Sequence, residues 1–164
     1  MKDFDELYSE LLESNFTKTE FLVEGKEKTV KGMVLLVSKN SPDSSYIKAV
    51  FTDGSFLLIL IQDKQLCYAD KLLGRLENVS DEEIGKLEQI VYKDKTYKLV
   101  NKDDYQYVLH RYIGRVQDVE GEARFSNYLS NDGEESLSLG WLSETGERAD
   151  VYCKSINVED VKIL

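Results

Sequence analysis

Histidine, proline and cysteine are scarce in this chain of 164 residues, which contains one histidine, one proline and two cysteines. Because His110 is the only histidine, a site with several histidine ligands is excluded, and a catalytic triad would have to use this residue. Cys67 and Cys153 lie far apart in the sequence and lack the C-x-x-C spacing of metal and redox sites. We therefore expect two buried thiols and no metal, with a long-range disulfide as the alternative.

Long hydrophobic runs are also missing. The longest one, Phe56 to Ile61, is far shorter than the roughly 20 apolar residues that span a bilayer. The N-terminal residues Met1 to Glu6 already carry charges, unlike the apolar region of a signal peptide. These absences predict a cytoplasmic protein without a transmembrane segment. Since no low-complexity linker divides the chain, we expect an amphipathic helix within residues 1–18 and a single β-rich domain at 19–164.

Basic residues are fewer than acidic residues in this chain. Thirty-one acidic residues against 21 basic ones give a formal charge of −10 and a pI near 4.7. The electric field of this negative charge repels the phosphates of nucleic acids and anionic membranes. We therefore predict no nucleic-acid partner. The charge favours solubility in general and, more specifically, a basic protein partner.

The familiar catalytic motifs are absent as well. There is no G-x-G-x-x-G, P-loop or G-x-S-x-G sequence, and Asn131-Asp132-Gly133 lacks the ligand spacing of an EF-hand. Most carboxylates lie in turns beside lysines, as solvated loop residues do. We therefore predict no cofactor and no catalytic residue. A hydrolase that uses carboxylates or His110 is kept as an alternative, because such groups meet only in the fold.

Apolar residues with helical spacing are present near the N-terminus. Between Asp3 and Phe16 they form one stripe, which comprises Phe4, Leu7, Tyr8, Leu11 and Leu12. Asp3 followed by Glu6 is a start signal of the capping-box type. This pattern predicts a helix that covers a sheet face, with an open barrel end or another protein as the alternative docking surfaces. A second capping box, Ser80 with Glu83, predicts one or two helical turns in residues 80–87.

After Thr19 the sequence consists of short β-rich runs separated by turn residues. Asp53-Gly54 supplies the positive φ values of a tight turn, so residues 49–52 and 56–60 should pair as antiparallel strands. Residues 105–116 are typical of one long strand. We predict a mainly β, β-rich α+β fold of antiparallel hairpins with one N-terminal helix.

Two pairs of segments resemble each other in the same order. Residues 23–31 match 91–98 as strand, turn, Lys-Thr and strand, and Tyr46 to Leu60 matches Phe125 to Leu139, with Leu58 aligned to Leu137. These matches predict two duplicated β-units, 20–76 and 88–164, that form a sandwich or half-barrels. The alternative is that hairpin-rich segments share such turn residues by chance.

Aromatic residues supply the candidate recognition surface, since Tyr and Trp combine apolar area with a polar tip. The wider set is Tyr92, Tyr97, Tyr105, Tyr107, Tyr112, Tyr128 and Trp141. From it we take Tyr105, Tyr107, Tyr112 and Trp141 as the predicted binding residues. Packing within the sheet is the alternative for each of them.

These hairpin units resemble the bacterial domain-of-unknown-function family numbered 4178. The shared features are Val30-Lys31-Gly32, a strand of the 46–50 type, the segment 125–129 leading to Leu137-Ser138-Leu139, and a closing strand at 158–163. The Trp-Glu pair that the family usually carries before its Leu-rich strand is missing. The resemblance implies a bacterial accessory β-domain and brings no activity or catalytic residue.

Together these observations predict a cytosolic binding or interaction module with a protein partner and without evident catalytic machinery. Homo-oligomerisation is left open. A second hypothesis is an acidic inhibitor or immunity-type protein that binds a basic toxin or nuclease. Carboxylates that cluster on the folded surface would favour this second hypothesis.

Overall fold

The fold was examined in a computed structural model, which describes residues 3–38, 45–113, 122–142 and 147–164. For residues 103–113, 122–123 and 142 the description covers the backbone alone. Within these ranges the protein is mostly β-structure with one N-terminal α-helix, which confirms the predicted fold class. None of the described helices has the length and apolarity that crossing a membrane requires.

The helix α1 (Phe4–Glu13) begins where the sequence predicts. The carboxylate of Asp3 accepts a hydrogen bond from the Glu6 amide at 2.9 Å, which caps the first turn. Phe4, Leu7 and Leu11 are buried, whereas Leu12 at the edge of the apolar stripe is 47% exposed. The chain leaves the helix through positive φ angles at Asn15 and Phe16.

The strands form one antiparallel sheet rather than two separate ones. They are β1 (Glu20–Val23), β2 (Lys26–Ser38), β3 (Ser45–Phe51), β4 (Phe56–Leu60), β5 (Gln65–Ala69), β6 (Leu72–Gly74), β7 (Gln89–Tyr92), β8 (Lys95–Ile113), β9 (Glu122–Ser130), β10 (Glu135–Leu142), β11 (Asp150–Ile156) and β12 (Val161–Ile163). A short 3-10 helix, Val158–Asp160, precedes β12.

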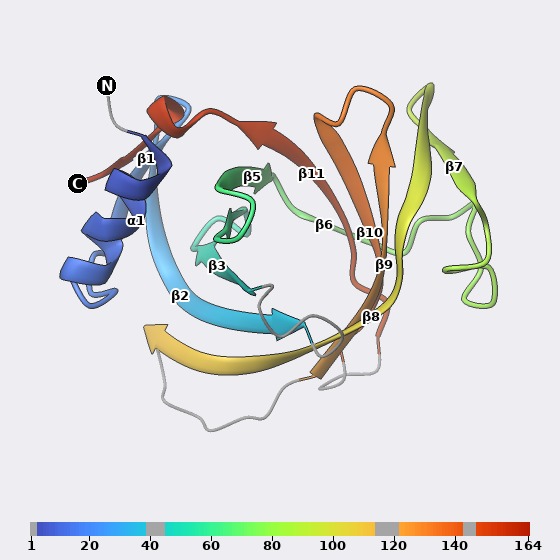
Figure 1. The fold of residues 1–164 in the computed structure, drawn as a ribbon, viewed down its shortest axis with the longest axis horizontal. Coiled ribbons are helices and arrows are strands. Elements are labelled where there is room, and N and C mark those ends of the chain that lie inside the picture. Colours follow the sequence, from blue (N-terminus) through green and yellow to red (C-terminus); the bar gives the residue numbers. More distant parts are fainter. Residues whose placement is uncertain (1–2, 39–44, 114–121, 143–146) are drawn as a thin grey trace.

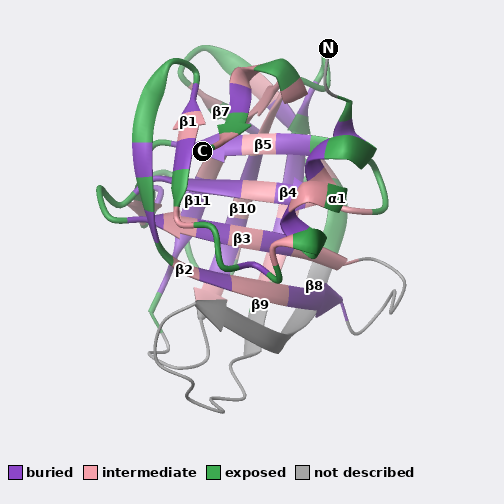
Figure 2. Cartoon of the chain, turned by 90° about the vertical axis from the view of Figure 1, so that its left-hand side faces the viewer, coloured by how far each residue is buried: buried purple, intermediate pink, exposed green. Residues whose placement is uncertain are grey.

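The sheet curls back on itself. Its order is β12-β1-β2-β3-β4-β5-β11-β10-β9-β8-β7, and β2 also pairs with β8 at residues 33–38 and 106–113. In Figure 1, α1 lies to the left of this curl and the β7–β8 hairpin lies to its right. Figure 2 shows α1 in front of the strands of the first part of the sheet. We call the side covered by α1 the outer face and the opposite side the inner face.

Two hydrophobic clusters lie on the outer face. The first packs α1 through Phe4, Leu7 and Leu11 against buried residues of β1 to β5. The second packs the irregular segment 75–88 against β8, β9, β10 and β11. Tyr68 of the first cluster pairs with Lys154 of β11, and Tyr152 of the second cluster lies two residues before Lys154. Because alternate residues share a face, both clusters lie on the same side of the sheet.

The strand order gives the chain two matching halves, β1 to β5 and β7 to β11, which meet where β5 pairs with β11. The corresponding hairpins also have similar turns. Positive φ angles occur at Glu24 and Gly25 between β1 and β2, and at Lys93 and Asp94 between β7 and β8. The duplication of two β-units stays a prediction.

One detail of the predicted match needs correction. Five residues separate the last pair of the β3–β4 hairpin, Val50 and Phe56, whereas six separate Leu129 and Ser136 in β9–β10. The extra residue makes Leu57, rather than Leu58, the counterpart of Leu137. Residues 80–87 also differ from the prediction, because they form consecutive turns instead of a helix. The Ser80 amide still donates to Glu83, but Gly85 has a φ of 78°, which no helix continues through.

Candidate functional site

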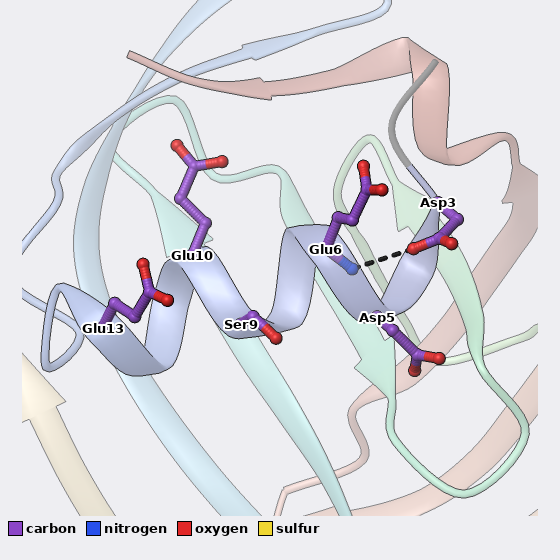
Figure 3. Close-up of a pocket in the computed structure, with 6 residues that line it drawn as sticks. All are labelled: Asp3, Asp5, Glu6, Ser9, Glu10 and Glu13. Atoms are coloured by element: carbon purple, nitrogen blue, oxygen red, sulfur yellow. Dashed lines mark hydrogen bonds between the residues drawn. The ribbon is translucent and has the colours of Figure 1, made fainter.

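A shallow hollow of about 550 Å³ runs along the solvent side of α1. Five of the six residues that line it are carboxylates: Asp3, Asp5, Glu6, Glu10 and Glu13, with Ser9 between them. Figure 3 shows the side chains of Glu6, Glu10 and Glu13 pointing to the same side of the helix. We call this set of six residues the acidic hollow.

The sequence places these carboxylates by helical periodicity. Glu6, Glu10 and Glu13 are spaced by four and three residues, so they lie in one row. The row flanks the buried residues Leu7 and Leu11, whose contacts with the sheet fix the orientation of the helix. The acidic hollow is therefore a surface presented by a firmly packed element.

The electrostatics of the acidic hollow differ between the two ends of α1. Asp5 and Glu6 lie in the first turn, where the positive end of the helix dipole favours them. Glu13 lies in the last turn, which has no basic residue, so it faces the negative end of the dipole. Neighbouring Glu6 and Glu10, and Glu10 and Glu13, repel each other at helical spacings. Lys64 reaches the hollow, with its Nζ 3.0 Å from Asp5 Oδ2.

The predicted aromatic site is only partly described. Trp141 of β10 is partly buried and packs against the second hydrophobic cluster. The Cζ atom of the Arg124 guanidinium lies over the indole, 5.1 Å from the centre of the Trp141 ring. Tyr105, Tyr107 and Tyr112 belong to β8, but their side chains, like that of His110, lie outside the described residues. The structure therefore does not test whether these four residues form one binding surface.

Other tyrosines of the aromatic set belong to the core. Tyr97 and Tyr128 are 1% and 0% exposed. The Tyr128 hydroxyl donates to the Leu87 carbonyl at 2.8 Å and accepts from the Gly85 amide at 3.3 Å. These two tyrosines hold segment 75–88 against the sheet and present no free surface to a partner.

Acidic and basic groups also meet inside the fold. The side chains of Arg148 and Asp150 are 2% and 0% exposed and form an ion pair. Asp150 also accepts from the Leu76 amide at 2.7 Å, and Arg148 donates to the Val79 carbonyl at 3.0 Å. Although burial opposes it, the hydrogen bonds to Asp150 and Asp81 raise the pKa of Arg148. Because these groups satisfy one another and the backbone, the cluster fastens segment 75–88 rather than forming a reactive centre.

Both cysteines are free thiols, as the sequence predicts. Cys153 is buried and Cys67 is partly buried. Burial raises the pKa of Cys67 and raises that of Cys153 to about 12, so both are protonated at neutral pH. No cluster of histidine, cysteine and carboxylate side chains able to hold a metal ion occurs in the part of the chain that the structure describes.

Comparison with known proteins adds no relative: no family model matches the chain, and neither a curated protein nor a solved structure matches it. The resemblance to the 4178 family therefore stays an expectation. The acidic hollow was not predicted from the sequence, because the prediction followed the apolar stripe of the helix and not the polar residues beside it. The spacing of residues 6, 10 and 13 was the signal that could have revealed it.

Proposed function

We propose that this protein is an interaction module that binds a basic segment of a protein partner through the acidic hollow. The observation that carries the proposal is the row of Glu6, Glu10 and Glu13 on one side of α1. These like charges repel one another at helical spacing and weaken the helix that presents them. A partner with lysines or arginines would relieve that repulsion on binding.

The packing beneath α1 supports the same proposal. Phe4, Leu7 and Leu11 are at most 7% exposed, so the helix is already ordered before a partner arrives. A pre-ordered surface avoids the entropy of folding on binding. The overall charge of −10 attracts a basic partner from a distance and speeds its association.

The inhibitor hypothesis is a narrower form of this proposal. Its partner would be a basic toxin or nuclease, and the clustering of carboxylates in the acidic hollow is the feature that favours it. An enzyme that uses carboxylates or His110 receives no comparable support from the described residues.

A charge-matched comparison tests the proposal. One variant carries Glu6→Gln, Glu10→Gln and Glu13→Gln, and the control carries Glu77→Gln, Glu82→Gln and Glu159→Gln, which also removes three exposed or partly exposed charges. The probe is a labelled peptide of alternating lysine and alanine, followed by fluorescence anisotropy and by NMR shifts of the α1 amides. We expect the first variant to bind roughly tenfold more weakly than the control.

Equal losses in the two variants would mean that net charge alone attracts the peptide, and the proposed site would be wrong. Affinity capture with the same three proteins then identifies the partner class. A protein retained by the wild type and the control but lost with the first variant uses the acidic hollow. If that protein is a basic toxin or nuclease, the inhibitor form is selected.

A further inference from the structure

Lys48 of β3 is a basic residue on the inner face of the sheet. Its neighbours in β3, Ile47 and Ala49, are fully buried in the first hydrophobic cluster on the outer face, so Lys48 points to the opposite side. It pairs across the strands with Val34 of β2 and Leu58 of β4. The side chain of Lys48 therefore lies between two aliphatic side chains, those of Val34 and Leu58.

The described side chains around Lys48 are mostly apolar. The inner face carries a third hydrophobic cluster of Phe56, Ala69, Val151 and Cys153, with Val50, Leu58 and Cys67 packed against it. The Nζ atom of Lys48 lies 4.4 Å from the ring centre of Phe56. We call Lys48 together with this third cluster the inner site.

Lys48 has no counter-charge within the described residues. None of the described ion pairs or hydrogen bonds involves its ammonium group, which contacts the Phe56 ring. Burial lowers the pKa of Lys48. A lysine in such a setting lacks the paired carboxylate that partly buried lysines usually have.

At the position in the second half of the sheet that corresponds to Lys48, the side chain is polar and has a hydrogen-bond partner. Lys48 lies two residues before Val50, and Asn127 lies two residues before Leu129, the counterpart of Val50. The amide oxygen of Asn127 accepts a hydrogen bond from the Ser138 hydroxyl at 2.7 Å. In the first half the corresponding neighbour is Leu58, which offers no acceptor. Among the described residues, Lys48 thus has no acceptor at the position where Asn127 and Ser138 pair with each other.

We propose that the inner site binds an amphipathic carboxylate, whose charged group pairs with Lys48 and whose apolar chain lies along Val50 and Leu58. The carboxylate supplies the missing acceptor, and its chain removes apolar surface from water. The inner side chains of Val50 and Leu58 are only partly buried, so this surface is not yet fully covered by the protein. The site is independent of the acidic hollow on the other side of the sheet.

Decanoate is the probe for this proposal, with 1-decanol as its uncharged analogue. Binding is followed by NMR of protein labelled at the valine and leucine methyl groups. We expect decanoate to shift the methyls of Val50 and Leu58 and to bind roughly tenfold more tightly than decanol. Lys48→Met should abolish this preference, whereas Lys48→Arg should keep most of it.

Lys162→Met, at an exposed position of β12, is the matched control and should leave decanoate binding unchanged. Amide spectra and thermal unfolding confirm that each variant is folded, and a misfolded Lys48→Met is replaced by Lys48→Gln. The proposal is overturned if decanoate does not bind, if decanol binds equally well, or if Lys48→Met and Lys162→Met bind alike. Shifts confined to methyls outside the inner site would overturn it too.

Discussion

The two halves of the sheet bury their outer faces in different ways. In the first half Leu66 lies two residues before Tyr68, which pairs with Leu57. In the second half Asp150 lies two residues before Tyr152, which pairs with Leu137. The same place in the sheet therefore holds a buried leucine in one half and a buried aspartate in the other.

The difference follows from what covers each half. The helix α1 satisfies its own backbone hydrogen bonds, so its contacts with the sheet can be wholly apolar. Segment 75–88 is irregular and leaves backbone groups without partners of its own. Asp150, Arg148 and Tyr128 supply those partners at Leu76, Val79, Gly85 and Leu87. A helix such as α1 can be held on the sheet by hydrophobic contacts alone. An irregular segment such as 75–88 also needs side chains that form hydrogen bonds with its backbone.

Asp150→Ala should have the largest effect. It leaves the Arg148 guanidinium buried without its main partner, and it leaves the Leu76 amide without an acceptor. We expect a loss of about 3–5 kcal/mol in the free energy of unfolding, measured by urea denaturation. The double change Asp150→Leu with Arg148→Met should recover part of the loss, because no unpaired charge remains. If Asp150→Ala is as stable as the wild type, the ion pair between Asp150 and Arg148 does not hold segment 75–88 on the sheet.

Leu11→Ala tests the apolar cover. The side chain is 0% exposed, and its removal leaves a cavity under α1, so we expect a loss of about 2–5 kcal/mol. Leu12→Ala is the control in the adjacent position, where 47% exposure predicts a change within about 0.5 kcal/mol. Similar losses in the two variants would contradict the described orientation of the helix.

Tyr128→Phe removes one polar anchor and little apolar area. The Gly85 amide and the Leu87 carbonyl each lose a partner, so we expect a loss of about 1–3 kcal/mol and faster hydrogen exchange in segment 75–88. Tyr8→Phe in α1 is the control, because the described contacts of Tyr8 are apolar and aromatic. Unchanged exchange at residues 75–88 in Tyr128→Phe would argue against the anchor.

Low pH should destabilise segment 75–88, which covers the second half of the sheet, by less than any of these substitutions. Hydrogen bonds from Arg148 and Arg75 lower the pKa of Asp81, and the Ser80 amide lowers that of Glu83. Because the folded pKa values lie below the ordinary values of 3.8 for Asp and 4.5 for Glu, the stabilisation is complete above those values and is lost as the pH falls below them. Hydrogen exchange of residues 75–88, corrected for its intrinsic pH dependence, measures the change. Asp81→Asn should reduce the acid sensitivity.

Local patterns sufficed for part of the fold. The helix start at Asp3 and the hairpin around Asp53-Gly54 depend on neighbouring residues, and both occur as predicted. The alternation in 47–51 also separates two faces, but the sequence does not tell which face is covered. For that reason Tyr97 and Tyr128 entered the predicted recognition set although they belong to the core.

Long-range contacts could not be predicted in the same way. Arg148 and Asp150 look like surface charges beside Glu147, and their partners Leu76 and Val79 are some 70 positions away along the chain. The pairing of β2 with β8 and of β5 with β11 likewise has no local signal. The burial of Lys48 depends on that curl of the sheet, so a pattern of neighbouring residues cannot reveal it.

The curl also determines how this sheet can meet other chains. Along the strand order, the sheet of the described residues ends at β12, with three residues, and at β7, with four. At these two ends, a strand from another molecule could extend the sheet only over three or four residues. Each end of the strand order therefore offers little backbone from which fibre growth or an edge-to-edge dimer could start.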